Sequence, residues 1–169
     1  MPFLALVPTH RIMLLGLDAE LIDALLEAVP EGFIGAVGAE AAIQKLRRRD
    51  APAVERGTLD LIEGTVARIP YRDHYFDRAL VYRGFEEWPS PVDGLREMRR
   101  ILGPGGSVVV AMHPVDPRLL RKHPERYNEV ARAADPKSSI LEAMEQAGFA
   151  RRSIGEDLFA VGHAPFTLD

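Results

Sequence analysis

Short apolar runs alternate with amphipathic stretches along most of this chain, and no other feature limits its fold as much. A run of about four to eight apolar residues between turn residues is typical of a strand buried on both faces. Seven such strands are predicted, over residues 11–16, 33–37, 59–62, 79–82, 107–112, 149–154 and 158–163. Strands separated by helical stretches indicate a mostly parallel sheet between two layers of helices.

The stretches between the strands carry apolar residues at helical spacing. Helices are predicted over residues 18–29, 39–49, 90–102 and 139–147. The first begins at an Asp18 N-cap and the last at a Ser139 N-cap, whereas residues 51–57 are predicted to form a loop. Gly155–Asp157 separates the last two strands closely enough to predict an antiparallel hairpin at the C-terminal end of the chain.

The length of 169 residues fits a single domain over 1–169, and 47% hydrophobic residues suffice for a buried core. The lack of cysteine excludes disulfides, thiolate metal sites and a cysteine nucleophile. A net charge of −4 argues against nucleic acid as a partner, and the basic run Arg47–Arg49 sits where cations stabilise a helix end. Asp116, His123 and Glu125 match no compact ligand spacing, so no metal site is predicted.

The apolar N-terminal stretch 1–17 is interrupted by Pro8, His10 and Arg11. A membrane-spanning helix needs ~20 apolar residues. A secretion signal places its positive charge before the apolar region, not within it. We therefore expect neither of these segments, and predict a cytoplasmic protein that does not contact a membrane.

Three segments after residue 63 stand out by their order and spacing. They read GTVARIPY at 64–71, DHYFD at 73–77 and LREMRRILGPGG at 95–106. This set resembles the class I S-adenosylmethionine-dependent methyltransferases, in the small-molecule branch that includes the ubiquinone and menaquinone methyltransferases. In that family an lPf.d.sFD stretch leads into the fourth strand and an E..RvLkPGG stretch leads into the fifth. The resemblance covers residues 11–163 and implies an α/β, Rossmann-like three-layer sandwich with a mostly parallel seven-stranded sheet and a C-terminal antiparallel hairpin.

The resemblance also implies S-adenosylmethionine as the cofactor, bound over a glycine-rich loop after the first strand. The family pattern D/E-x-G-x-G-x-G falls on residues 14–20, where Gly16 is the one glycine. Leu17, Asp18 and Glu20 place side chains where the family has little or none. This departure predicts that the loop hinders the cofactor sterically.

In the same family an acidic residue at the end of the second strand accepts hydrogen bonds from both ribose hydroxyls. That position falls on Val37 or Gly38 here, and Glu40 is displaced by two or three residues. An aspartate that usually meets the adenine amine corresponds to Thr65. If the cofactor binds, the resemblance places beside it Gly16, Asp18, Val37, Gly38 and Thr65.

Candidate residues for a methyl acceptor follow the fourth and fifth predicted strands. His113 lies at the sheet edge where ligands bind in such folds and is a candidate general base. Glu86 is the second candidate catalytic residue, because its carboxylate can hold an amine nucleophile. Tyr82 and Trp88 are candidate substrate contacts. The structural alternatives are a loop histidine, a solvated glutamate and a tryptophan that anchors the following helix.

These observations predict a methyltransferase-like protein with weakened or lost cofactor binding, which acts as a regulatory or structural partner in a homo-oligomer or with an active relative. The alternative is an active methyltransferase that moves a methyl group from S-adenosylmethionine to a small-molecule acceptor. A third hypothesis is a module that binds another small ligand at the same crevice. Only ten residues precede Arg11, so no N-terminal lid is expected, and residues 113–137 are predicted to form a variable insert.

Overall fold

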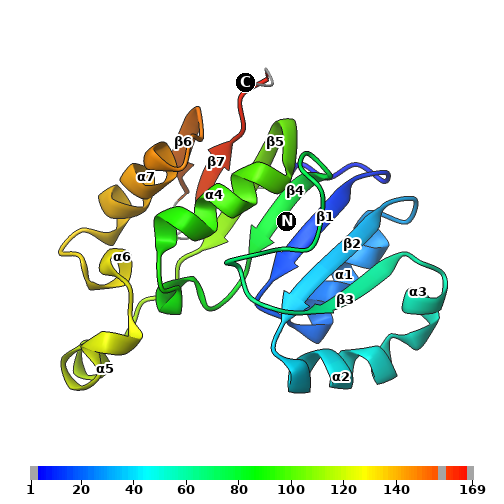
Figure 1. Ribbon diagram of the computed structural model, residues 1–169, viewed down its shortest axis with the longest axis horizontal. Coiled ribbons are helices and arrows are strands. Elements are labelled where there is room, and N and C mark those ends of the chain that lie inside the picture. The colour runs from blue at the N-terminus through cyan, green and yellow to red at the C-terminus, as the bar shows by residue number, and fades with distance from the viewer. Residues whose placement is uncertain (1–3, 156–158, 167–169) are drawn as a thin grey trace.

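The structure, a computed structural model, describes residues 4–155 and 159–166. Its centre is a seven-stranded sheet in the order β3-β2-β1-β4-β5-β7-β6 (Figure 1). Neighbouring strands pair in parallel except at β7, which runs antiparallel to β5 and β6. The mostly parallel sheet and the C-terminal antiparallel hairpin are therefore confirmed. The strands are β1 Arg11–Leu15, β2 Phe33–Gly38, β3 Leu59–Glu63, β4 Phe76–Val81, β5 Leu102–Ala111, β6 Arg151–Ile154 and β7 Phe159–His163.

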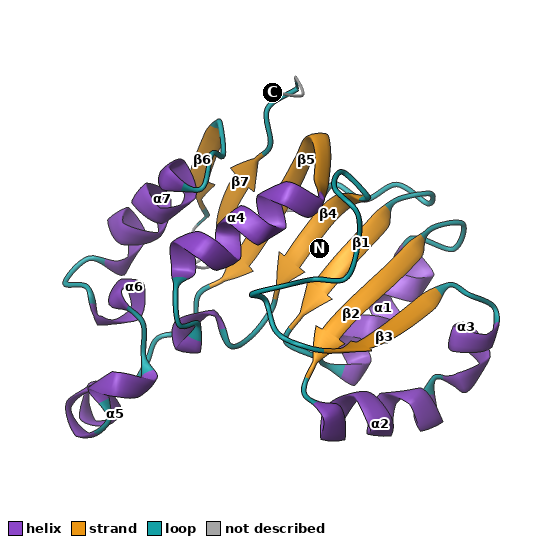
Figure 2. Ribbon diagram, in the orientation of Figure 1, coloured by secondary structure: helices purple, strands orange, loops and turns teal. Residues whose placement is uncertain are grey.

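Helices cover both faces of the sheet and complete the predicted three-layer arrangement. In Figure 2, α1 lies behind the sheet, whereas α4 and α7 lie in front of it. Within the described ranges, no helix has the length and apolar character needed to cross a membrane. The helices are α1 Ala19–Ala28, α2 Glu40–Arg49, α3 Ala51–Glu55, α4 Pro91–Ile101, α5 Pro117–Lys122, α6 Glu129–Arg132 and α7 Pro136–Gln146, with short 3-10 helices η2 Phe85–Glu87 and η3 Pro124–Arg126.

Two helix boundaries differ from the prediction, and a proline lies at each. Residues Ala51–Glu55 form α3 where the sequence predicts a loop, and Pro52 occupies the first turn, where a helix tolerates proline. α7 begins after an Asp135 N-cap rather than at Ser139, with Pro136 as its first residue. Asp135 accepts hydrogen bonds from two backbone N–H groups of the first turn, at 3.1 and 3.4 Å. Proline therefore marks a helix start at both places.

The strand ends also shift from their predicted positions. β5 begins at Leu102 rather than Ser107, because the predicted glycine turn lies within the strand as an irregularity. Phe76 pairs with Leu102, and Arg78 then pairs with Ser107. Of the predicted hairpin turn Gly155–Asp157, residues 156 and 157 lie outside the described residues, as does residue 158, the predicted start of the last strand.

The apolar side chains of the strands divide into two buried clusters, one on each face of the sheet. Ile12 and Leu14 point to the α1 side, whereas Met13 and Leu15 point to the α4 side. This is the two-residue period of a strand. Because both faces are covered, the central strands read as continuous apolar runs instead of alternating polar and apolar residues.

The connection between β3 and β4 packs on the sheet without forming a helix: residues 64–75 are all described and all irregular. The rings of Tyr71 and Tyr75 stack with their centroids 5.2 Å apart. Both rings also meet Phe33 and Phe76 edge-on, at 4.8 to 6.1 Å. This aromatic cluster covers the α4-side face of β2 in place of a helix.

Two charged residues of α4 hold this connection in place. The Arg100 guanidinium donates to the carbonyls of Ile69 and Tyr71 at 2.9 and 2.8 Å, and to the carboxylate of Asp73 at 2.7 Å. Glu97 accepts a hydrogen bond from the Ile69 N–H at 2.7 Å and pairs with Arg100. The hydrogen bonds from Arg100 hold the pKa of Glu97 below its ordinary value. Glu97 and Arg100 of the LREMRRILGPGG segment therefore anchor this loop.

We expect Glu97→Gln to lower the free energy of unfolding near neutral pH by about 1–2 kcal/mol, because an amide replaces charge-assisted hydrogen bonds. A lowered folded-state pKa gives stability that is present above the ordinary glutamate pKa and is lost as the pH falls through the lowered value. The difference in free energy of unfolding between wild type and variant, measured by urea denaturation, should therefore shrink as the pH falls below the ordinary glutamate pKa. Glu142→Gln, at an exposed position of α7, is the control. A difference that stays constant over this range would contradict the assignment.

Candidate functional site

The candidate site lies at the carboxyl ends of the parallel strands, where sheets of this kind bind ligands. The loop after β1 carries residues 16–18, the end of β2 carries residues 37–38 and the loop after β3 carries residue 65, and we call these segments the cofactor half. The loops after β4 and β5 carry residues 82–88 and 113, and we call them the acceptor half. Both halves lie on one edge of the sheet (Figure 1).

Gly16 brings the loop after β1 directly against the loop after β4. Its φ of +80° lies in the left-handed region that favours glycine. A Cβ added to Gly16 would lie 2.4 Å from the backbone nitrogen of Arg83 and 2.6 Å from its oxygen. Just before this contact, the Tyr82 N–H donates to the Leu15 carbonyl at 2.8 Å. The two loop backbones touch at Gly16, and no ligand fits between them there.

Leu17 fills the space between the ends of β1 and β2. A Cβ added to Gly38 would lie 2.4 Å from Leu17 Cδ1 and 2.8 Å from Leu17 Cγ, so the leucine side chain rests directly on Gly38. Leu17 is half-buried and packs against the apolar cluster on the α1 side. Leu17 therefore covers Gly38, one of the two positions at which the resemblance places the acid that holds the ribose.

The other residues of the cofactor half belong to the fold or face solvent. Asp18 is the N-cap of α1, and its Oδ1 accepts a hydrogen bond from the Leu21 N–H at 3.0 Å. Val37 is 3% exposed and packs in the core on the α4 side. Thr65 is exposed after β3, and Glu40 is exposed as the first residue of α2. The carboxylate of Asp18 and the side chain of Val37 thus serve the helix cap and the core.

In the acceptor half, the structure brings Tyr82, Glu86 and His113 together. Oε1 of Glu86 accepts a hydrogen bond from the backbone N–H of His113 at 2.6 Å. The imidazole Nε2 of His113 lies 2.7 Å from the Tyr82 carbonyl oxygen, and the two rings meet edge-on at 6.2 Å. The Arg83 guanidinium lies over the Tyr82 ring, 5.2 Å from its centroid. Residues that the sequence predicts separately form one connected cluster.

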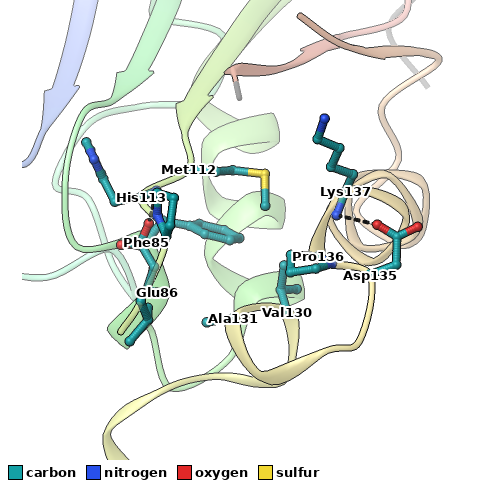
Figure 3. Close-up of a pocket in the computed structure, with 11 residues that line it drawn as sticks. Phe85, Glu86, Met112, His113, Val130, Ala131, Asp135, Pro136 and Lys137 are labelled. Carbon is teal, nitrogen blue, oxygen red and sulfur yellow. Dashed lines mark hydrogen bonds between the residues drawn. The ribbon is translucent and has the colours of Figure 1, made fainter. Parts of the chain in front are cut away.

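The contact with Tyr82 also fixes the tautomer of a neutral His113. A carbonyl oxygen can only accept, so Nε2 carries the proton and Nδ1 keeps its lone pair. In Figure 3 the imidazole points away from Met112 and Lys137. Neutral His113 can therefore accept a proton or a hydrogen bond at Nδ1 alone.

A pocket of about 250 Å³ opens beside this cluster (Figure 3). Side chains after β4 and β5 form one wall, and the segment around α6 and the start of α7 forms the other. Most of the lining is apolar, so the pocket suits a small and largely apolar ligand. It is lined by Phe85, Glu86, Met112, His113, Pro114, Val115, Val130, Ala131, Asp135, Pro136 and Lys137.

The segment that closes this pocket lies in residues 113–137, the stretch predicted to form a variable insert, and the sequence did not predict its burial. Val130 is 1% exposed and Asn128 is 5% exposed. Asn128 Nδ2 donates to the Phe85 carbonyl at 2.6 Å, and Asn128 Oδ1 accepts from the Ala131 N–H at 2.9 Å. Asn128 thus caps α6 and ties it to η2. The available signal was an asparagine N-cap before Glu129 and a single valine.

Trp88 lies in the core between η2 and α4. It is 8% exposed, and its ring meets Phe85 edge-on at 5.1 Å. A Cβ added to Gly94 of α4 would lie 2.5 Å from the indole ring, so helix and tryptophan are in close contact. These contacts fit the helix-anchoring alternative, and Trp88 is not among the residues that line the pocket of Figure 3.

Comparisons with known proteins agree with this geometry at the level of the family. The family model for a methyltransferase domain matches residues 20–110, which is more than half of the chain and begins after the Gly16 loop. The demethylmenaquinone methyltransferase of Geobacillus kaustophilus (strain HTA426) is 27% identical over 150 residues, which cover 75% of this chain and 64% of that protein. The chain therefore spans less than two thirds of that relative.

Solved structures share the fold at lower sequence identity. A protein assigned as a methyltransferase, in complex with the Haloferax volcanii methyltransferase activator Trm112, matches with a TM-score of 0.77 at 17% identity, over 96% of this chain and 85% of that chain. A protein assigned as an S-adenosyl-L-methionine-dependent methyltransferase from Methanococcus maripaludis matches with a TM-score of 0.73 at 17% identity, over 98% and 81%. At this identity the two structures show the fold alone. With the domain match added, the chain belongs to the class I S-adenosylmethionine-dependent methyltransferase family.

Proposed function

We propose that this chain is a methyltransferase-fold protein in which binding of S-adenosylmethionine at the family position is weakened or lost. It acts as a regulatory or structural partner of another protein. The contact between Leu17 and Gly38 carries the proposal, because the resemblance places the ribose-binding acid at Val37 or Gly38 and an apolar side chain covers Gly38. The contact between Gly16 and the Arg83 backbone supports it, because it closes the neighbouring part of the crevice.

Energetics point the same way. A charge-assisted contact with the ribose contributes about 1.5–3 kcal/mol, so its loss weakens binding by about 10- to 100-fold. Leu17 adds a steric cost, because its half-buried side chain must move before a ribose can approach. Oδ1 of Asp18 is taken by the α1 N-cap, so a ligand would have to use Oδ2 or displace the cap, which costs about 1 kcal/mol. The residues present therefore do not fit the cofactor in that position.

A partner role is consistent with what this fold retains. The sheet, both helix layers and the loop anchor at Arg100 and Glu97 are intact, while in the cofactor half Leu17 covers Gly38 and Gly16 meets the Arg83 backbone. The comparison with the Haloferax volcanii complex supplies a precedent, since a methyltransferase-fold protein there is bound to an activator. For this chain we extend the idea to a second copy of itself or to an active methyltransferase.

Calorimetric titration of the whole chain with S-adenosylmethionine and S-adenosylhomocysteine tests the loss of cofactor binding. We expect no saturable heat and no rise in melting temperature at about 1 mM ligand. A dissociation constant below about 100 µM, a binding free energy of about −5.5 kcal/mol, would contradict the proposal. That result would favour the alternative, an active methyltransferase with a small-molecule acceptor.

A second candidate function is favoured by the pocket of Figure 3, namely binding of a small apolar ligand without S-adenosylmethionine. The dye 8-anilinonaphthalene-1-sulfonate is a suitable probe, because its fluorescence rises in apolar surroundings. Ala131→Trp should fill the pocket and weaken saturable dye binding at least about fivefold. Ala134→Trp, at an exposed position outside the lining, is the matched control. Equal dye binding by both variants would rule this candidate out.

A further inference from the structure

The described helices cover the two faces of the sheet unevenly. α1, α2 and α3 contact β2 or β3 on one face, whereas α4 and α7 contact β5, β6 or β7 on the opposite face. Figure 1 shows the same division, with α1 to α3 in the right half of the view. Beyond α1, Leu4 of the N-terminal segment packs on the α1-side face; it is 2% exposed, and its carbonyl accepts from Arg78 Nε at 2.7 Å.

A groove of about 340 Å³ lies on this face, and we call it the α1 groove. Leu80 of β4 and Val109 of β5 are buried beneath it, at 4% and 1% exposed. Most of its lining is apolar or aromatic, so contact with an apolar partner surface is favourable. The groove is lined by Leu4, Asp18, Glu20, Leu21, Leu80, Tyr82, Val109 and Phe159.

The wall that α1 contributes to the groove is acidic. Every charged side chain in residues 18–31 is an aspartate or a glutamate. Glu20, Glu27 and Glu31 are exposed. Of the acids in this stretch, Asp23 alone forms a salt bridge within the described part of the chain, and it does so on the α2 side. The groove therefore pairs an apolar floor with two acids, Asp18 and Glu20, that form no salt bridge with any described residue.

We propose that the α1 groove docks an amphipathic helix of a partner protein, with leucine or phenylalanine side chains in the groove and lysine or arginine beside Glu20. This inference rests on the proposed role of the chain as a partner protein. A helix suits the place, because helices pack on sheet faces, as α1 does next to the groove, whereas an added strand pairs with a sheet edge. Because Asp18 and Glu20 carry negative charge without a salt-bridge partner among the described residues, they favour a basic helix over an acidic one.

Two synthetic peptides of about 14 residues, long enough to form a helix on binding, test the inference. Both carry leucines at helical spacing, with lysine at the remaining positions of one peptide and glutamate in the other. In calorimetric titrations at about 150 mM salt, the whole chain should bind the leucine–lysine peptide saturably with 1:1 stoichiometry. Binding of the leucine–glutamate peptide should be at least about tenfold weaker.

A pair of double variants separates docking in the groove from general attraction to an acidic protein. Asp18→Asn with Glu20→Gln removes two charges at the groove, and asparagine keeps the N-cap of α1. Glu55→Gln with Glu142→Gln removes two charges at exposed positions elsewhere. The groove variant should bind the leucine–lysine peptide at least about fivefold more weakly than the wild type does, and the control variant less than about twofold more weakly. Equal effects of the two variants, or no saturable binding by the wild type, would overturn the inference.

Analytical ultracentrifugation tests whether a second copy of the chain, instead of a partner helix, occupies the groove. We expect the wild type and the groove variant to have the same oligomeric state. If the wild type forms a dimer and the groove variant does not, the groove is the interface of a homo-oligomer, and docking of a partner helix is overturned. Failure here is distinguishable from failure of the proposed function. If the chain binds neither the leucine–lysine peptide nor S-adenosylmethionine, the docking inference fails and the proposed function stands. If S-adenosylmethionine binds, the proposed function fails whatever the peptides do.

Discussion

Replacing Gly16 with alanine is expected to lower the free energy of unfolding by about 2–5 kcal/mol, because two separate costs add. An L-residue at a φ of +80° pays about 1–2 kcal/mol for the left-handed conformation. The new Cβ would also lie 2.4 Å from the Arg83 backbone nitrogen, and overpacking typically costs about 1–3 kcal/mol. Backbone atoms at this distance cannot turn aside as a flexible side chain can.

Gly57→Ala is the matched control for Gly16→Ala. Gly57 has a φ of +71°, and no other part of the described chain comes within 4 Å of an added Cβ. The free energy of unfolding of this variant should fall by about 1–2 kcal/mol, which is the cost of the left-handed conformation alone. Urea denaturation of both variants measures the difference. Equal losses would mean that the loops after β1 and β4 do not touch at Gly16, and that the crevice is open there.

The second large effect is a gain of function. Leu17→Gly combined with Gly38→Asp should bind S-adenosylhomocysteine about 10- to 100-fold more tightly than the wild type. The first change removes the side chain that fills the crevice, and the second places a carboxylate at the end of β2. The two must be combined, because a Cβ on residue 38 would lie 2.4 Å from Leu17 Cδ1. Titration calorimetry measures the affinity, and a circular dichroism melt verifies that the variant is folded.

Leu17→Gly with Gly38→Asn isolates the charge. It opens the same space and adds a side chain of the same size, so any difference in affinity comes from the carboxylate. The asparagine variant should recover only part of the gain. A folded aspartate variant that binds S-adenosylhomocysteine no better than the wild type would show that Leu17 and the missing acid are not what prevents binding.

Much of the fold follows from the sequence because the strands are apolar on both faces. Runs such as Ile12–Leu15 are too short for a stable helix and too apolar for the protein surface, so they predict buried strands correctly. α3 was missed because Pro52 is read as a breaker, although at the first turn of a helix it costs no hydrogen bond. The Asp135 cap was missed because Ser139 with Glu142 three residues later has the pattern of a capping pair, so the helix was predicted to begin at Ser139.

The candidate site is only partly readable from the sequence. Spacing places Gly16, Gly38 and His113 at strand ends, and the structure puts each of them there. The contacts that decide what the site can hold join loops far apart in the chain, such as Gly16 with Arg83. No periodicity or motif reports such a contact. The sequence also does not predict the burial of Val130, because the segment around α6 is polar and Val130 is covered only by tertiary packing.

Backbone amide NMR, with S-adenosylhomocysteine titrated to about 1 mM, reports on the crevice residue by residue. If cofactor binding is lost as proposed, the amides of Gly16, Leu17 and Gly38 should keep their chemical shifts throughout, because the Leu17 side chain rests on Gly38 and leaves no room there for a ribose. Saturable shifts of these three amides, all with the same apparent dissociation constant, would contradict a filled crevice and show that the loop after β1 opens to admit the ligand.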